Sequence, residues 1–289
     1  MPPRKISSFG SLEQSIITLM QTPYGKELAH NCYYDWNVVN ACARFNESEE
    51  WQAVTSLLRK LTLHGTEVLD LGAGNGIASY SLAKLGYSVT AIEPDPSDLV
   101  GYGAIKEMSE STKSSINILS SVGEHLPFSD DYFSLVYTRQ VLHHADNLGR
   151  MLKEISRVLK PKGILIATRE HVIDDQKSLE IFLDRHPLHI YTRSEWAYTE
   201  SEYIEQMRSA NLKTQYVIHP WDSVINHFPI TNGELNKKME FHMRKYFGIL
   251  GMLIIHLPSI NKIYRAIKSY RDSTPGRVFT FVAIVNETG

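Results

Sequence analysis

The chain has 289 residues, of which 43% are hydrophobic and 21% charged, so it is ordinary globular material that can bury a sizeable core. Its 30 basic and 32 acidic residues give a net charge of -2, which offers no global basic surface, and we expect no nucleic-acid partner. Two cysteines are too few for a disulfide framework, and no apolar segment predicts a secretory signal or a membrane span, so we expect a cytoplasmic protein.

Residues 1–62 predict helices and show no strand alternation. Residues 12–20 carry a helical pattern, and an aromatic-rich stretch follows with Tyr33, Tyr34 and Trp36. Asn46 and Glu49 are spaced as an N-cap and its N3 partner, and the apolar residues after them recur at helical spacing. The sequence therefore predicts an N-terminal helical cover over residues 1–62.

From residue 63 onward, short apolar runs alternate with helical patterns. The predicted strands are residues 68–71, 88–92, 116–119, 133–137, 164–168, 213–219 and 277–285. Helices are predicted at residues 77–85, 97–109 and 148–159, and Thr199 with Glu202 predicts a capping box that opens another helix. Because parallel strands need crossover connections, this alternation predicts a doubly wound parallel α/β sheet, with a core over residues 63–219 and 277–289.

The connection between the last two predicted strands, residues 220–276, is much longer than usual and predicts a helical insertion or lid. Its part from residue 237 to residue 271 is rich in lysine and arginine, and these flank the apolar run 247–257. One interpretation is a basic, apolar hairpin that contacts an anionic membrane surface peripherally. The other is a helical lid or dimer surface with a solvated basic face, and the oligomeric state stays open.

The first predicted strand runs into a glycine-rich loop that reads Gly72, Ala73, Gly74, Asn75, Gly76. Such glycines let a backbone approach a ligand closely, and the following helix directs free N–H groups at it. The dinucleotide fingerprint would place its third glycine at position 77, which is Ile77. Glu93, at the end of the second strand, is suited to accept hydrogen bonds from ribose hydroxyls. The loop predicts a nucleoside-containing cofactor.

This loop, with Glu93 after the second strand, resembles class I S-adenosylmethionine-dependent methyltransferases. Two further blocks resemble a subgroup that acts mostly on small molecules: residues 124–128, and residues 141–144 leading to residues 157–163. Together the blocks cover roughly residues 60–170. The resemblance implies a Rossmann-like, doubly wound, seven-stranded sheet whose last strand is antiparallel, with N-terminal helices and a helical insertion before that strand.

By position, the resemblance implies S-adenosyl-L-methionine as cofactor, with S-adenosyl-L-homocysteine as product. Asp70 would hold the amino group, the loop glycines the methionine half, Glu93 the ribose, and Pro94 would lie near the adenine. The family usually has an acid where this chain has Val122, so the adenine is expected to be bound by backbone atoms. The implied cofactor-binding residues are Asp70, Gly72, Ala73, Gly74, Gly76, Glu93, Pro94, Val122, Gly123 and Arg139.

Residues that follow the fourth and fifth strands should face the acceptor, because ligands lie beyond the carboxyl ends of such strands. His171 is the first candidate for a catalytic base, with Glu170 or Asp174 to orient it, and His144 is the second. The alternative is that these histidines cap turns or pack under a helix. No metal site is predicted.

Other side chains are candidates for binding rather than for proton transfer. Arg169 and Arg193 could clamp an anionic acceptor, or be paired structurally. The rings of Tyr33, Tyr34 and Trp36 could shield the sulfonium, or pack in the core.

The predicted function is methyl transfer to an oxygen or nitrogen of a small molecule or glycan precursor, by in-line displacement from the sulfonium. A glycan precursor is considered as the acceptor because residues 169–229 loosely resemble enzymes of surface-polysaccharide pathways. Two alternatives remain: an NAD(P)-dependent oxidoreductase, and a catalytically inactive methyltransferase-like binding module. The acceptor, the methylated atom and the need for a base do not follow from the sequence.

Overall fold

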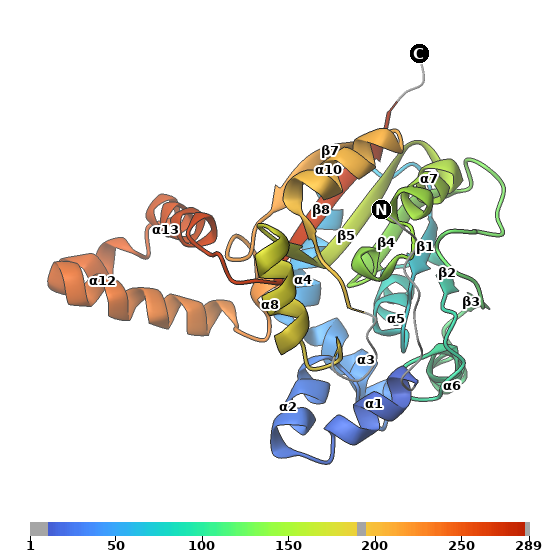
Figure 1. Cartoon of the computed structure of the whole chain (residues 1–289), viewed down its shortest axis with the longest axis horizontal. Coiled ribbons are helices and arrows are strands. Elements are labelled where there is room, and N and C mark those ends of the chain that lie inside the picture. The colour runs from blue at the N-terminus through green and yellow to red at the C-terminus, as the bar shows by residue number, and fades with distance from the viewer. Residues whose placement is uncertain (1–10, 190–194, 287–289) are drawn as a thin grey trace.

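A twisted sheet forms the centre of the molecule in the computed structural model, which describes residues 11–189 and 195–286 (Figure 1). Its strand order is β3-β2-β1-β4-β5-β8-β7, and β6 pairs with the end of β5. The strands are β1 (Glu67–Leu71), β2 (Ser88–Ile92), β3 (Ile116–Leu119), β4 (Phe133–Arg139), β5 (Leu159–Ile173), β6 (Tyr198–Thr199), β7 (Leu212–Ile218) and β8 (Arg277–Val285).

The sheet confirms the predicted fold class. Strands β1 to β5 pair in parallel, whereas β8 is antiparallel to both β5 and β7. Two details differ from the expectation: β5 is much longer than predicted, and the two-residue β6 is an additional short strand. Opposite β8, β5 is irregular between Ala167 and Glu170, and Arg169 there has a left-handed φ of 61°. Such a bulge changes the direction of the side chains that follow it.

The helices cover both faces of the sheet because alternate strand residues point to opposite faces. The helical elements before the insertion are α1 (Leu12–Leu19), α2 (Pro23–Asn31), α3 (Val38–Glu47), α4 (Glu49–Leu58), α5 (Ile77–Lys84), α6 (Tyr102–Thr112), the 3₁₀ turn η1 (Leu142–His144), α7 (Leu148–Val158), α8 (Gln176–Arg185) and α10 (Glu200–Ser209). Val68 and Leu135 pack on one face with α3, α4, α5 and α6, while Leu69 and Val136 pack on the other with α7 and α10.

One predicted helix start is confirmed and another is wrong. Thr199 and Glu202 form both bonds of the predicted capping box at α10. At α4, however, the N-cap is Ser48, whose hydroxyl accepts a bond from the backbone N–H of Trp51 at 3.1 Å. Asn46 lies inside α3, because the chain leaves the helical conformation only at Ser48. A serine cap two residues later satisfies the same kind of free N–H group.

The insertion forms α11 (Val224–His227), α12 (Asn232–Ile254) and α13 (Pro258–Tyr270), and the last two project from the body as a helical hairpin (Figure 1). Helix α12 is kinked at Gly248, where φ is 60° and ψ is -149°. Leu235, Met239 and Ile255 form a small core within the hairpin. Within residues 11–189 and 195–286, no helix has the length and apolar character needed to cross a membrane.

Candidate functional site

A cavity of about 590 Å³ lies at the carboxyl ends of the central strands. Its wall is formed by the ends of β1, β2 and β4, by the glycine loop, by residues of α1 and α2, and by a group of histidines after β4 and β5. Open α/β sheets bind their ligands at this edge. The volume falls in the range of roughly 300–1,000 Å³ that is usual for small-molecule sites.

Gly74 is the loop glycine that borders open space. Its φ is +56°, and a Cβ atom added to it would meet a single neighbour within 4 Å, the carbonyl oxygen of Val100 at 3.7 Å. Its N–H donates to Oε2 of Glu93 at 2.8 Å, and the N–H of Asp95 donates to Oε1 at 2.9 Å. The Glu93 carboxylate is thereby fixed next to the loop. Burial raises the pKa of this carboxyl above its usual value.

The other two loop glycines are packed against side chains. A Cβ on Gly72 would lie 2.6 Å from Cγ2 of Val141, and one on Gly76 would lie 3.1 Å from Cγ1 of Ile105. Gly72 and Ala73 line the cavity, whereas Gly76 is absent from its wall. Gly76 therefore serves the turn into α5, where its φ of +85° suits glycine.

Asp70 lies at the end of β1 beneath the loop and is 1% exposed. Its Oδ2 accepts a hydrogen bond from the Ser79 hydroxyl at 2.5 Å. Burial raises the pKa of the Asp70 carboxyl to about 7, and the nearby Glu93 contributes to the increase. The charge on Asp70 consequently depends on pH near neutrality.

The predicted residues on the adenine side also line the cavity. Pro94, Gly123 and the half-exposed Val122 are part of its wall, and so is Glu124, which the sequence placed in a motif block without a role. Of the aromatic residues, Tyr34 lines the cavity, whereas Tyr33 is 1% exposed and Trp36 is 69% exposed. Tyr33 stacks on Phe228 and belongs to the core.

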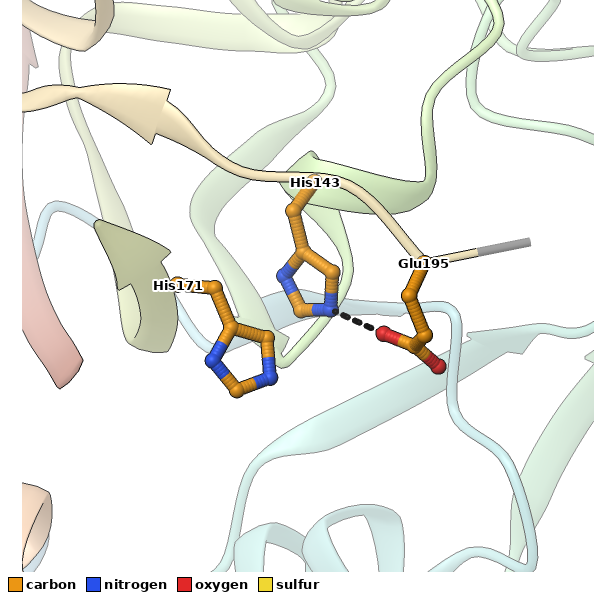
Figure 2. A group of neighbouring side chains, drawn as sticks. All are labelled: His143, His171 and Glu195. Carbon is orange, nitrogen blue, oxygen red and sulfur yellow. Dashed lines mark ion pairs between the residues drawn. The ribbon is translucent and has the colours of Figure 1, made fainter. Parts of the chain in front are cut away.

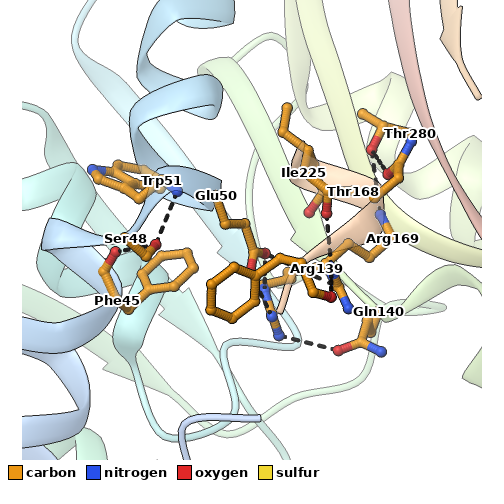
Figure 3. A network of polar contacts seen from close by, with 12 residues as sticks. Phe45, Ser48, Glu50, Trp51, Arg139, Gln140, Thr168, Arg169, Ile225 and Thr280 are labelled. Atoms are coloured by element: carbon orange, nitrogen blue, oxygen red, sulfur yellow. Dashed lines mark hydrogen bonds and ion pairs between the residues drawn. The ribbon is translucent and has the colours of Figure 1, made fainter. Parts of the chain in front are cut away.

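Arg139 lines the cavity, but its guanidinium is bound from behind by Glu50 of α4 (Figure 3). Its Nε lies 2.7 Å from Oε1 and its Nη2 lies 3.1 Å from Oε2 of the fully buried Glu50. Burial alone would lower the pKa of the Arg139 guanidinium, but the Glu50 carboxylate raises it above its usual value. Pattern reasoning missed Glu50, because its partner is 89 positions away in the chain.

Arg169 is also directed toward Glu50, with 4.0 Å between its Nε and Oε1 of the carboxylate. Its Nη1 donates to the carbonyl oxygens of Ile225 and Phe228, at 2.8 and 3.1 Å. These bonds join β5 to the start of the insertion. The other predicted anion clamp, Arg193, lies outside the described residues.

A group of histidines borders the cavity where β4 and β5 end. The Nδ1 atom of His143 lies 2.7 Å from Oε2 of Glu170. Glu170 also accepts the backbone N–H groups of Val141, Leu142 and His143, so it caps the η1 turn. Burial alone would raise the pKa of the Glu170 carboxyl, but these contacts lower it below its usual value. For His143, burial lowers the pKa of the imidazole. The pair is therefore an ionised carboxylate and a neutral imidazole that donates from Nδ1.

His171 lies next to His143, with ring centroids 4.6 Å apart (Figure 2). Its Nδ1 is 2.7 Å from the carbonyl oxygen of Gly276. Burial, aided by His143, lowers the pKa of His171 to about 3. Neither acid that was expected to orient it does so in the described structure: Glu170 pairs with His143, and Asp174 pairs with Arg277.

Glu195 faces these rings from the segment before β6 (Figure 2). Its Oε2 lies 3.6 Å from Nε2 of His143, and its Oε1 lies 4.0 Å from both His144 and His186. Burial alone would raise the pKa of the Glu195 carboxyl, but the surrounding His144 and His186 rings lower it to about 2. Sequence reasoning missed Glu195 and His186, because no motif links them to the residues after β4.

Known proteins resemble this chain over its central part. A family model described as a methyltransferase domain matches residues 69–167. The chain is 27% identical over 175 residues to an uncharacterized methyltransferase, YcgJ, of Bacillus subtilis. The matched region covers 55% of this chain and 62% of that protein. It is 30% identical over 142 residues to a demethylmenaquinone methyltransferase of Lactococcus lactis. This matched region covers 49% of this chain and 56% of that protein. The chain thus matches less than two thirds of the length of these relatives.

A solved structure extends the likeness to most of the fold. The crystal structure of the YcgJ protein from Bacillus subtilis aligns with a TM-score of 0.53 at 16% identity, and covers 83% of this chain and 100% of that chain. At this level of identity the likeness is one of fold. It agrees with the α/β sheet described above.

Proposed function

We propose that this chain, whose residues 69–167 form a class I S-adenosylmethionine-dependent methyltransferase domain, transfers the methyl group of that cofactor to an oxygen or nitrogen of a small molecule. One observation carries the proposal: a single cavity is bordered by the Gly74 and Glu93 loop and by the histidine group. The relative named as a demethylmenaquinone methyltransferase supports a small-molecule acceptor. A glycan precursor remains the second acceptor class.

The residues of the cavity fit the cofactor. The position beside Gly74 is open, so a ligand can lie against the backbone where a side chain would otherwise project. Glu93 keeps acceptor capacity for ribose hydroxyls after its two backbone bonds, since a carboxylate has about four lone-pair sites. Asp70 supplies an acidic partner for an ammonium group, and Tyr34 a ring beside a cation. Helices α1 and α2, within the proposed cover of residues 1–62, line the same cavity.

When bound, the cofactor supplies an electrophilic methyl group, and the reaction is an in-line displacement. The chain then contributes position and exclusion of water. Gly74 and Glu93 fix one end of the cavity, and the histidine group forms the end at which an acceptor would bind. The pair formed by Arg139 and Glu50 holds the wall between these ends in place.

Binding of S-adenosylhomocysteine is expected to depend on the protonation of Asp70. Only the ionised carboxylate forms an ion pair with the ligand's ammonium group, and the pKa of this carboxyl is raised to about 7. The dissociation constant should therefore rise about tenfold for each pH unit below about pH 7, where the ligand's amino group stays protonated. Calorimetric titrations over this pH range measure the effect.

The Asp70→Asn variant should bind the ligand more weakly and lose this pH dependence. The matched control is Asp131→Asn, which changes an exposed acid outside the cavity wall and should retain it. A slope that persists in Asp70→Asn would show that another group titrates.

For an acceptor that keeps its proton, we propose His144 as the base, in place of His171. The His144 side chain is 40% exposed and lines the cavity, whereas His171 is 8% exposed and bonded to Gly276. The His144→Asn variant should lower the methyl-transfer rate by about 10²- to 10⁴-fold and leave the affinity for S-adenosylhomocysteine unchanged. His125→Asn, an exposed histidine outside the cavity wall, is the control. An unchanged rate in His144→Asn would exclude this role.

The activity is tested by incubating the protein with S-adenosylmethionine carrying a deuterated methyl group and an extract of small molecules. Mass spectrometry should find a compound that gains one labelled methyl group with the wild-type protein and not with Gly74→Trp. Titration with NAD and NADP separates the oxidoreductase alternative. Binding of a nicotinamide cofactor without S-adenosylmethionine binding would overturn the proposal, and cofactor binding without any labelled product would favour the inactive binding module.

We further propose that the α12 and α13 hairpin contacts an anionic membrane surface. Tyr246, Phe247, Ile249 and Leu250 surround the kink at Gly248 and are 62% to 73% exposed. The hairpin also carries an excess of basic residues, and this combination suits a surface with anionic headgroups. The basic residues are Lys237, Lys238, Arg244, Lys245, Lys262, Arg265, Lys268 and Arg271.

The protein is expected to sediment with phosphatidylglycerol vesicles more strongly than with phosphatidylcholine vesicles. The double variant Phe247→Glu with Leu250→Glu should lose this binding, because it removes apolar contact and adds like charge. Tyr24→Glu, at an equally exposed aromatic residue on the body, should retain it. Equal sedimentation with both lipids, or a dimer that the double variant dissociates, would contradict membrane contact.

A further inference from the structure

We propose that His143, His171 and Glu195 bind a divalent transition-metal ion at the acceptor end of the cavity (Figure 2). One nitrogen from each histidine and one oxygen from Glu195 all lie within 4.8 Å of one another, and the three residues are buried. The sequence predicts no metal site, because these ligands come from three separate segments. Two imidazoles and one carboxylate are a recurrent ligand set for metals that keep an open coordination position.

The hydrogen bonds at the back of the two rings fix the tautomers that a metal site requires. The carbonyl oxygen of Gly276 can only accept, so Nδ1 of His171 carries the proton and Nε2 carries the lone pair. The Glu170 carboxylate already accepts three backbone N–H groups, so His143 likewise donates from Nδ1. Metal-binding histidines usually donate their second N–H to a carboxylate or backbone carbonyl in this way.

The second ring nitrogen of His143 faces the carboxylate of Glu195. Nε2 of His143 lies 3.6 Å from Oε2 of Glu195, and a lone pair opposite a carboxylate oxygen is unfavourable unless a cation lies between them. Bonds of about 2.0–2.2 Å would place tetrahedral ligand atoms about 3.4 Å apart. The His143 and Glu195 atoms are close to this value, and no pair has to approach by more than about 1.4 Å, which small side-chain rotations can supply.

The position of the cluster suggests what a bound ion would do. All three residues line the cavity, so an open coordination position faces the space in which the acceptor would lie. An ion there would bind an acceptor oxygen and lower the pKa of its hydroxyl. This effect on the acceptor rests on the proposed methyl transfer. The metal-binding site itself does not, because it is inferred from the positions of His143, His171 and Glu195.

The test uses the full chain without a polyhistidine tag, with Zn²⁺ or Co²⁺ alone as the probe. After dialysis against Zn²⁺, mass spectrometry of the metal content should give about one ion per chain, and Co²⁺ should show visible absorption of a low-coordinate site. His171→Asn and Glu195→Gln should each weaken Zn²⁺ binding by more than about 10-fold. Both variants keep His143, whose removal would take a partner from the buried Glu170.

The matched control is His256→Ala, an exposed histidine on the hairpin, which should bind Zn²⁺ like the wild type. Binding of S-adenosylhomocysteine, measured on the same samples, shows that each variant is folded and tests the cofactor site separately. Zn²⁺ affinity that is unchanged in both site variants would overturn the metal site. Loss of Zn²⁺ from the dialysed wild type would also overturn it, and neither result bears on cofactor binding.

Discussion

Replacing Gly74 with tryptophan is expected to abolish binding of S-adenosylhomocysteine, with a loss of about 100-fold or more in affinity. The position beside its Cα is open cavity, so the indole would occupy the space in which the ligand lies against the loop. Calorimetry of the purified variant measures the loss. The labelled-methyl assay should show no product from the same sample.

The control for this variant is Gly86→Trp. Gly86 also has a left-handed φ, of +90°, and a Cβ on it would meet nothing within 4 Å. A tryptophan there bears a conformational cost of the same kind, of at least about 1–2 kcal/mol, outside the cavity wall. If Gly74→Trp bound the ligand as well as Gly86→Trp does, the glycine loop would not be the cofactor site.

Replacing Glu50 with alanine is expected to lower the free energy of unfolding by about 3–5 kcal/mol. The change would leave Arg139 buried without its carboxylate, and Arg169 would lose the acid that lies 4.0 Å from its Nε (Figure 3). The side chains of the two arginines are 11% and 13% exposed, so water cannot replace the missing partner fully. Urea denaturation followed by circular dichroism measures the difference.

The control removes an ion pair of similar geometry from the surface. Arg208 donates three hydrogen bonds to Glu205 on α10, from its Nε and Nη2, and their side chains are 73% and 54% exposed. Glu205→Ala should change the stability by less than about 1 kcal/mol, because exposed pairs contribute little. A Glu50→Ala variant no less stable than Glu205→Ala would show that the buried pair does not hold α4 to the sheet.

The fold and one end of the candidate site could be predicted because their signals are local in the chain. Apolar runs at strand spacing gave the sheet, and the long connection between the last two strands gave the helical insertion. The turn after β1 could be predicted for the same reason. Gly74 and Glu93 follow the ends of two adjacent parallel strands, β1 and β2, and are joined by a hydrogen bond. The wrong N-cap prediction at Asn46 was also local, because it placed the start of α4 only two residues too early.

The roles of individual loop glycines could not be predicted in this way. Gly72, Gly74 and Gly76 look equivalent in the sequence, but only the tertiary structure places Val141 against the first and Ile105 against the last. Val141, in the segment after β4, and Ile105 of α6 fill the space beside two of the glycines, which leaves open space beside Gly74. Spacing within a motif carries no information about such partners.

The sequence by itself determined the sheet and the glycine loop with its acid at Glu93, and it indicated the class of cofactor. Only the tertiary structure decided the partners of the buried charges: Glu50 with Arg139, and Glu170 with His143 rather than with its neighbour His171. The physical reason is that buried ionisable groups pair with whatever the fold brings within hydrogen-bond distance, and the β5 irregularity before Glu170 sets that direction. The grouping of His143, His171 and Glu195 arises in the same way, from segments that meet only when the chain is folded.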